Sequence, residues 1–158
     1  MKGQSRSARI LLVDDNPGDV LLISEALAEF RAIATLDVAI DGVEAMEFLR
    51  RQGRFLDKPR PDIILLDLEL PRKGGKEVLA EVKNDDELKL IPIIVLSSSN
   101  APQDVVRSYS LHANCYVVKP FHLDDLTNTV KSIVTFWLTV VRLPEALNGT
   151  YQSSADRG

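Results

Sequence analysis

The stretch ILLVDD, residues 10–15, decides the fold, and three further stretches of the chain repeat its design. Each is a short apolar run that ends in a polar side chain: IILLD at 63–67, PIIVLS at 92–97 and CYVVK at 115–119. Continuous apolar runs of this length, rich in Val, Ile and Leu, are typical of strands buried on both faces, as in a parallel sheet covered by helices. The sequence therefore predicts an α/β fold.

Apolar residues at helical spacing separate the strand-like runs, and a further strand is expected over residues 35–40. The helical stretches are Val20 to Phe30, Ala45 to Leu49, Val78 to Val82, Val105 to Tyr109 and, from a start near His122, Leu123 to Val141. Five alternations of strand and helix with short loops imply right-handed crossovers. We expect a doubly wound five-stranded parallel sheet with helices on both faces, in the flavodoxin-like order 2-1-3-4-5, which is one common solution.

Length and composition point to a single domain. The chain has 158 residues, is 45% hydrophobic and carries a formal net charge of −4. We expect one domain over residues 8–144 with an extended last helix, followed by a polar, flexible tail over 145–158. The single Cys115 excludes an internal disulfide and fits a reducing cytoplasm. The acidic balance disfavours a broad nucleic-acid surface, and no apolar stretch has the length of a membrane span.

Polar residues at the strand ends form the candidate site. In open parallel sheets ligands bind beyond the carboxyl ends of the strands, so five side chains should converge there. They are Asp14, Asp15, Asp67, Ser97 and Lys119. Three clustered carboxylates would raise one another's pKa unless a cation intervenes, and Mg²⁺ accepts carboxylates, waters and phosphate oxygens. Taken alone, Asp-Asp-Asn-Pro-Gly is also ordinary turn and helix-start chemistry.

Asp67 is the predicted nucleophile, because a merely structural carboxylate at the end of a long buried run would be costly to desolvate. A carboxylate oxygen can attack phosphorus and hold the phosphoryl group as a mixed anhydride. The charge of the transferred group needs cations and donors, which Lys119 and the Ser97 hydroxyl can supply. Considered singly, Lys119 could equally be a surface lysine, and Ser97 could equally serve turn or cap chemistry.

These motifs in combination resemble the receiver domains of response regulators in two-component signalling. The resemblance spans residues 9–137 and rests on LLVDD, LLDLELP with a following GG, VLSSS, and YVVKPF. It implies that Asp67 accepts phosphate from the phosphohistidine of a sensor histidine kinase and takes part in a Mg²⁺ site. In that site Asp15 would bind the metal directly, Asp14 largely through water, and Glu69 through its backbone carbonyl.

The same resemblance assigns a switch to the other side of the site. Ser97 would be the switch hydroxyl, Tyr116 the switch aromatic and Lys119 the phosphate-contacting lysine. The Lys119–Pro120 peptide bond would be cis, as in the family, and the cis form costs little before proline.

A closer resemblance is to stand-alone receivers that work with cyanobacterial and bacterial phytochromes, on the stretches SYSLHANCYVVKPF and FWLTVVRLP. It implies a phytochrome-type histidine kinase as partner. A last helix that is apolar all round needs another surface, for which we prefer a homodimer contact over folding back of the tail. The candidate contact residues are Phe136, Leu138, Val140 and Leu143.

Two other classes of function stay open. One is a phosphatase or phosphotransferase with an aspartyl intermediate, although such enzymes usually place two aspartates two residues apart after the first strand. The other is a receiver-like binding module that never uses phosphate, although such relatives usually lack a site residue that is present here. Three departures from the family pattern, Glu69, Gly74 and Ser98, affect details: Glu69 could alter attack of water on the acyl phosphate or simply point to solvent.

Overall fold

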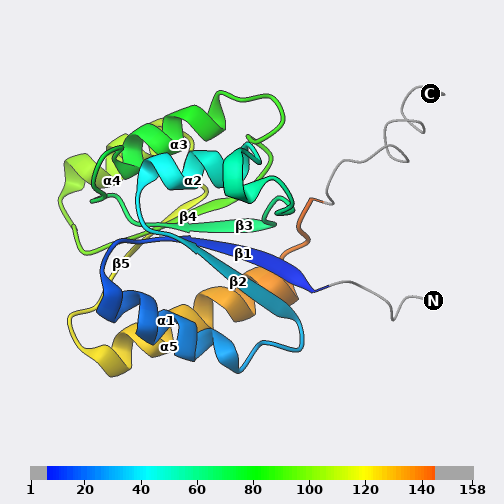
Figure 1. Ribbon diagram of the computed structural model, residues 1–158. Coiled ribbons are helices and arrows are strands. Elements are labelled where there is room, and N and C mark those ends of the chain that lie inside the picture. The colour runs from blue at the N-terminus through cyan, green and yellow to red at the C-terminus, as the bar shows by residue number, and fades with distance from the viewer. Residues whose placement is uncertain (1–6, 145–158) are drawn as a thin grey trace.

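Five parallel strands form one sheet in the order β2-β1-β3-β4-β5 in the described part of the chain, residues 7–144 of a computed structural model (Figure 1). The strands are β1 (Ala8–Val13), β2 (Ala34–Ala39), β3 (Ile63–Leu66), β4 (Ile93–Ser97) and β5 (Cys115–Val118). This is the predicted flavodoxin-like order. The strand expected at 35–40 is displaced by one residue, and Ile40 beyond its end is exposed.

Helices cover both faces of the sheet, as Figure 1 shows. The helices α1 (Pro17–Ala28) and α5 (Leu123–Thr135) lie on one face. The helices α2 (Gly42–Leu49), α3 (Gly75–Lys83) and α4 (Pro102–Ser110) lie on the other. A 3₁₀ turn occupies Gly53–Phe55, and a π-helical turn, Phe136–Val140, continues α5. The doubly wound α/β architecture is confirmed.

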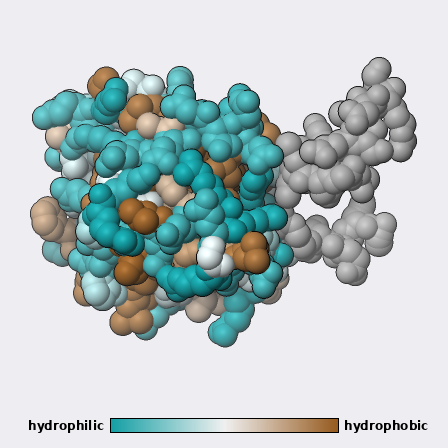
Figure 2. Space-filling model, turned by 45° about the horizontal axis from the view of Figure 1, so that its top comes forward, coloured by the Kyte–Doolittle hydropathy of each residue, from teal (hydrophilic) through white to brown (hydrophobic). Residues whose placement is uncertain are grey.

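Alternating side chains of the central strands fill two separate cores, because successive residues of a strand point to opposite faces. Leu11 and Val13 of β1 pack in the core under α2 and α3. Ile10 and Leu12 pack in the core under α1 and α5. All four are at most 1% exposed. Burial on both faces explains why these strands are continuously apolar. On the face in Figure 2, by contrast, hydrophilic side chains predominate and hydrophobic ones form separate groups.

The strand register brings the acidic ends of β1 and β3 together. Val13 is paired with Leu66, so Asp14 and Asp67 follow adjacent residues of neighbouring strands. The Asp67 backbone N–H donates to the Val13 carbonyl at 2.9 Å. Toward the other edge of the sheet, where β4 pairs with β5, the Lys119 N–H donates to the Ser97 carbonyl at 2.7 Å. Backbone pairing therefore fixes the positions from which the site side chains project, independently of contacts between those side chains.

Gly75, the first residue of α3, allows this helix to pack directly on the strand end that carries Asp67. A Cβ at this position would lie 2.3 Å from the Asp67 carbonyl oxygen and 2.5 Å from Leu68 Cα. Both neighbours are backbone atoms, which cannot swing aside as a flexible side chain can. Only glycine fits here without moving the backbone of Asp67.

We therefore expect Gly75→Ala to lower the free energy of unfolding by about 3 kcal/mol, the upper range for overpacking a tight contact. The adjacent Gly74 provides a matched control, because a Cβ there meets no atom nearer than 3.7 Å. Gly74→Ala should cost about 1 kcal/mol or less, through a poorer helix cap. Urea unfolding of both variants measures the difference. Equal losses would show that the close contact at Gly75 is relieved without cost.

Of two expectations about the last part of the chain, one is wrong and the other concerns residues outside the described part. No peptide bond among residues 7–144 is cis, so the Lys119–Pro120 bond is trans and the expected cis bond is wrong for this structure. The trans preference before proline is only about 0.5–1 kcal/mol, so local structure rather than sequence similarity decides the isomer. The expected flexible tail, 145–158, lies outside the described residues. No helix in the described residues is long and apolar enough to cross a membrane.

Candidate functional site

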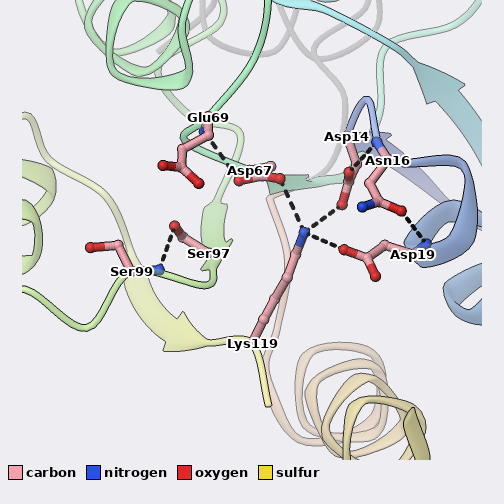
Figure 3. Close-up of polar contacts among 8 residues, drawn as sticks. All are labelled: Asp14, Asn16, Asp19, Asp67, Glu69, Ser97, Ser99 and Lys119. Atoms are coloured by element: carbon pink, nitrogen blue, oxygen red, sulfur yellow. Dashed lines mark hydrogen bonds and ion pairs between the residues drawn. The ribbon is translucent and has the colours of Figure 1, made fainter. Parts of the chain in front are cut away.

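Lys119 lies at the centre of the site and donates to three carboxylates. Its Nζ is 2.8 Å from Asp14 Oδ2, 2.9 Å from Asp19 Oδ2 and 3.0 Å from Asp67 Oδ2 (Figure 3). The Lys119 side chain is 8% exposed. The strand ends of β1, β3 and β5 and the first turn of α1 thus meet at one ammonium group. The predicted convergence of Asp14, Asp67 and Lys119 is present.

Three aspartates of the site form a potential metal-binding group. Asp14, Asp15 and Asp67 each offer a carboxylate oxygen, and these oxygens lie within 4.8 Å of one another. Asp14 and Asp67 are buried, and Asp15 is exposed, so the group opens to solvent on one side. Hard oxygen donors with an open side suit Mg²⁺, which prefers a few carboxylates and keeps several waters. The residues present fit this ion.

Burial and charge act against each other on the two ends of the Asp14–Lys119 pair. Burial raises the pKa of the Asp14 carboxyl above its usual value, and the hydrogen bond from Lys119 offsets this only in part. Burial alone would lower the pKa of Lys119, but the hydrogen bonds to Asp14 and Asp19 and the charge of Asp67 outweigh it, so the pKa is raised. The raised pKa of Lys119 follows from one ammonium being shared among several carboxylates, whereas that of Asp14 follows from its burial. Negative charge is therefore in excess at the site.

Ser97 and Tyr116 both form hydrogen bonds with Ser99, in the loop that follows β4. Ser97 is fully buried, and its Oγ accepts a hydrogen bond from the Ser99 N–H at 3.2 Å. The Tyr116 hydroxyl donates to the Ser99 carbonyl at 2.7 Å. Ser99 Oγ in turn donates to Asp104 Oδ2 of α4 at 2.5 Å. The predicted switch hydroxyl and switch aromatic therefore contact the same residue, Ser99, which the sequence reasoning did not single out.

A pocket of about 260 Å³ opens beside Ser97, between the loops that follow β3 and β4. Glu69, Lys76 and Ser99 are among the residues that line it. The Glu69 N–H donates to Asp67 Oδ1 at 3.1 Å, and its side chain is exposed. Of the two roles considered for the Glu69 side chain, exposure favours contact with solvent. The role of its backbone carbonyl as a metal ligand stays a prediction.

Asp19 is the contact of Lys119 that the sequence reasoning missed. The stretch Asn16-Pro17-Gly18-Asp19 has an ordinary structural explanation, since Asn16 Oδ1 caps α1 by accepting from the Asp19 N–H at 3.0 Å. An acidic residue in a first helical turn is also common for reasons of the helix dipole. The one available indication was position: only three residues separate β1 from α1, so the first turn of α1 borders the same edge of the sheet.

A comparison with protein families decides what kind of site this is. The family model for the response regulator receiver domain matches residues 10–131. The chain belongs to the response regulator receiver family. Receiver domains bind Mg²⁺ or Mn²⁺ at an acidic cluster, and in this receiver Asp14, Asp15 and Asp67 form an acidic group that could hold such an ion.

Similar proteins include receivers linked to phytochromes. The receiver is 47% identical over 137 residues to Response regulator Rcp1 of Synechocystis sp., covering 87% of this chain and 93% of Rcp1. The crystal structure of the phosphorylated cyanobacterial phytochrome response regulator RcpA has a TM-score of 0.86 at 47% identity, over 88% of this chain and 99% of that one. The Mn²⁺-bound form of Rcp1 has a TM-score of 0.84 at 46% identity, over 87% and 99%. The expected resemblance to phytochrome-associated response regulators is confirmed.

Proposed function

We propose that this receiver is a response regulator in which Asp67 accepts a phosphoryl group from a sensor histidine kinase in a Mg²⁺-dependent phosphorelay. The observation that carries the proposal is the meeting of Asp67 with Lys119 at 3.0 Å inside the group formed with Asp14 and Asp15. That arrangement offers a nucleophile, a permanent cation and a potential metal site within one small volume. The structure of the similar RcpA is described as phosphorylated, which supports the same chemistry here.

In the proposed reaction an Asp67 carboxylate oxygen forms a bond to phosphorus while the bond from phosphorus to the imidazole nitrogen breaks. The imidazole leaves with its electron pair and takes up a proton from solvent. Lys119 turns the N–H that now reaches Asp67 toward a phosphoryl oxygen, and Ser97 Oγ donates to another. Mg²⁺, when bound by Asp14, Asp15 and Asp67, supplies positive charge that offsets the phosphoryl charge.

The phosphoryl group would shift an existing equilibrium between two conformations of the domain. Ser97 reaches Ser99, and Ser99 reaches both Tyr116 and Asp104, so a movement of Ser97 toward the phosphate disturbs contacts of β5 and α4. We propose that output is delivered by protein contact at this face and not by catalysis. Similarity to Rcp1 and RcpA supports a phytochrome-type kinase as the donor, acting in the cytoplasm.

Stoichiometry of labelling tests this function against its enzymatic rival. Incubation with Mg²⁺ and radiolabelled acetyl phosphate should yield one phosphoryl group per chain, with an acid-stable and base-labile acyl phosphate bond. Sustained turnover of small phosphate esters would favour an aspartyl phosphatase. Absence of labelling, with no effect of beryllium fluoride and Mg²⁺ on the structure, would favour a receiver-like binding module.

We further propose that two copies pair through the end of α5 and the turn that follows it. Phe136 is 51% exposed and Val140 71% exposed, whereas Leu138 and Leu143 are partly buried against the core of α1 and α5. Of the four predicted contact residues, Phe136 and Val140 are therefore the exposed apolar groups. Two exposed apolar side chains four residues apart on one helical turn suit a self-complementary contact.

Val140→Asp should weaken such a dimer by at least about tenfold, because each protomer would bury an unpaired charge at the contact. Sedimentation velocity with and without beryllium fluoride and Mg²⁺ measures the association. Leu56→Asp is the matched control, since Leu56 is 68% exposed and lies in the connection before β3. A dimer that survives Val140→Asp would place the contact elsewhere, and a monomer at all concentrations would exclude pairing.

A further inference from the structure

One of the three partners of Lys119, Asp19, has no part in the chemistry described so far. A lysine ammonium has three N–H donors, and the bonds to Asp14, Asp19 and Asp67 use all of them. Asp14 belongs to the potential metal group, and Asp67 is the proposed acceptor. Asp19 is outside the metal group and is not the acceptor. Its carboxylate lies 2.9 Å from Lys119 Nζ (Figure 3).

Asp19 is held by a rigid element. It lies in the first turn of α1, where its N–H is bound by the Asn16 cap at 3.0 Å, and α1 packs against α5 on the sheet. Its side chain is 25% exposed, against 8% for Lys119. The helix therefore fixes the backbone that carries this carboxylate, independently of the strand ends that carry the metal group.

We propose that Asp19 is a positioning residue, which holds Lys119 so that one N–H stays directed at Asp67 and at the phosphoryl group that Asp67 accepts. This inference rests on the proposed phosphoacceptor function. Phosphorylation converts the Asp67 carboxylate into an acyl phosphate, and the N–H that reached Asp67 is then free for a phosphoryl oxygen. The bonds to Asp14 and Asp19 need not break in this exchange.

The physical reason is the flexibility of the lysine stem. A lysine side chain has four rotatable bonds, and its ammonium is a compact point charge without a preferred direction. With Asp14 alone as an anchor, the ammonium would sample orientations that direct no N–H to Asp67, and phosphoryl binding would have to order it. A simple charge effect has the opposite sign, because removing the negative Asp19 would favour an incoming anion.

Two substitutions of Asp19 separate positioning from charge. Asp19→Ala removes both the charge and the hydrogen-bond acceptor, whereas Asp19→Asn removes the charge and keeps an acceptor oxygen in place. Asp124→Ala is the control, because Asp124 is an exposed acidic residue of the first turn of α5 and lies on another helix. Each full-length variant is titrated with beryllium fluoride in saturating Mg²⁺, and separately with Mg²⁺ alone, by calorimetry.

For Asp19→Ala we expect beryllium fluoride to bind about fivefold more weakly than in wild type, because the hydrogen bond that orients Lys119 is lost. Asp19→Asn should stay within about twofold of wild type, and Asp124→Ala should be unchanged. With Mg²⁺ alone, the Asn and Ala variants should behave alike, since both lose one charge and keep the metal group; this result also shows that both are folded.

The outcomes distinguish this inference from the proposed function. A wild-type protein that binds Mg²⁺ but not beryllium fluoride would overturn the phosphoacceptor function and the role of Asp19 with it. If wild type binds and Asp19→Ala binds equally well or more tightly, only the role of Asp19 is refuted. Equal weakening in the Asn and Ala variants would also refute it, because the acceptor oxygen that asparagine keeps would then not be what holds Lys119.

Discussion

Asp67→Asn is expected to abolish phosphorylation by acetyl phosphate or a cognate kinase, a loss of at least about a thousandfold. An amide oxygen is a far weaker nucleophile than a carboxylate oxygen, because it carries no negative charge. Asparagine has nearly the same shape, and its Oδ1 can still accept from the Glu69 N–H, which lies 3.1 Å from Asp67 Oδ1. The fold should therefore survive while the chemistry is lost.

Labelling with radioactive acetyl phosphate in Mg²⁺, alongside thermal unfolding, measures both properties. Asp57→Asn is the control, because Asp57 is an exposed aspartate in the connection before β3 and should keep full labelling. Undiminished labelling of Asp67→Asn would show that another residue is the acceptor. Lost labelling with a large fall in the unfolding temperature would leave Asp67 a structural role instead.

The strands could be predicted from the sequence because burial on both faces makes a local pattern. Ile64 and Leu65 point to opposite cores and are both fully buried, so their run contains no polar position. Such a run is not mistaken for an amphipathic helix, which has a polar face. Parallel pairing then places the residues after each run at one edge. Asp14, Asp67 and Lys119 follow directly from that argument, since each is the first residue beyond a strand.

Other parts of the site depend on contacts that a local pattern does not contain. Asp19 reaches Lys119 across 100 residues of sequence, yet its own stretch is fully explained as a helix start. Ser99 was one of several serines in a polar run, and only the fold shows that Tyr116 and Asp104 both bind it. The isomer of the Lys119–Pro120 bond involves a free-energy difference too small for the sequence to decide.

The Glu69 side chain lies close to the proposed acceptor, but its exposure argues against a direct part in the chemistry. Its N–H is bound to Asp67, but its carboxylate is exposed beside the pocket that Ser97 and Lys76 also line. An exposed carboxylate is screened by water and contributes little to the affinity of the site for a phosphoryl group. It can still affect which molecules enter the pocket, because Glu69 is one of the residues that line it.

Lys119→Met is expected to change the affinities for phosphate and for metal in opposite directions. Methionine keeps an unbranched apolar stem but removes the ammonium that contacts Asp14, Asp19 and Asp67. Losing the cation that faces the phosphoryl group should weaken beryllium fluoride binding and slow phosphorylation by about a hundredfold, as for other oxyanion contacts. Losing the same cation should strengthen Mg²⁺ binding, because a repulsive charge next to Asp14 and Asp67 is gone.

Misfolding would not explain this result, because it would weaken the binding of both beryllium fluoride and Mg²⁺, whereas here the two affinities change in opposite directions. Without Mg²⁺, buried Asp14 has no counter-charge in this variant, so the free energy of unfolding of the variant should fall by about 2 kcal/mol. The loss is smaller than for a fully enclosed ion pair, because the site opens to solvent at Asp15. Saturating Mg²⁺ should recover most of that loss, since binding to the folded state adds stability. Lys89→Met, at a lysine 51% exposed, should change neither affinity. If Lys119→Met bound Mg²⁺ more weakly than wild type, the ammonium would be supporting the metal group and not competing with it, and the electrostatic account of this site would be wrong.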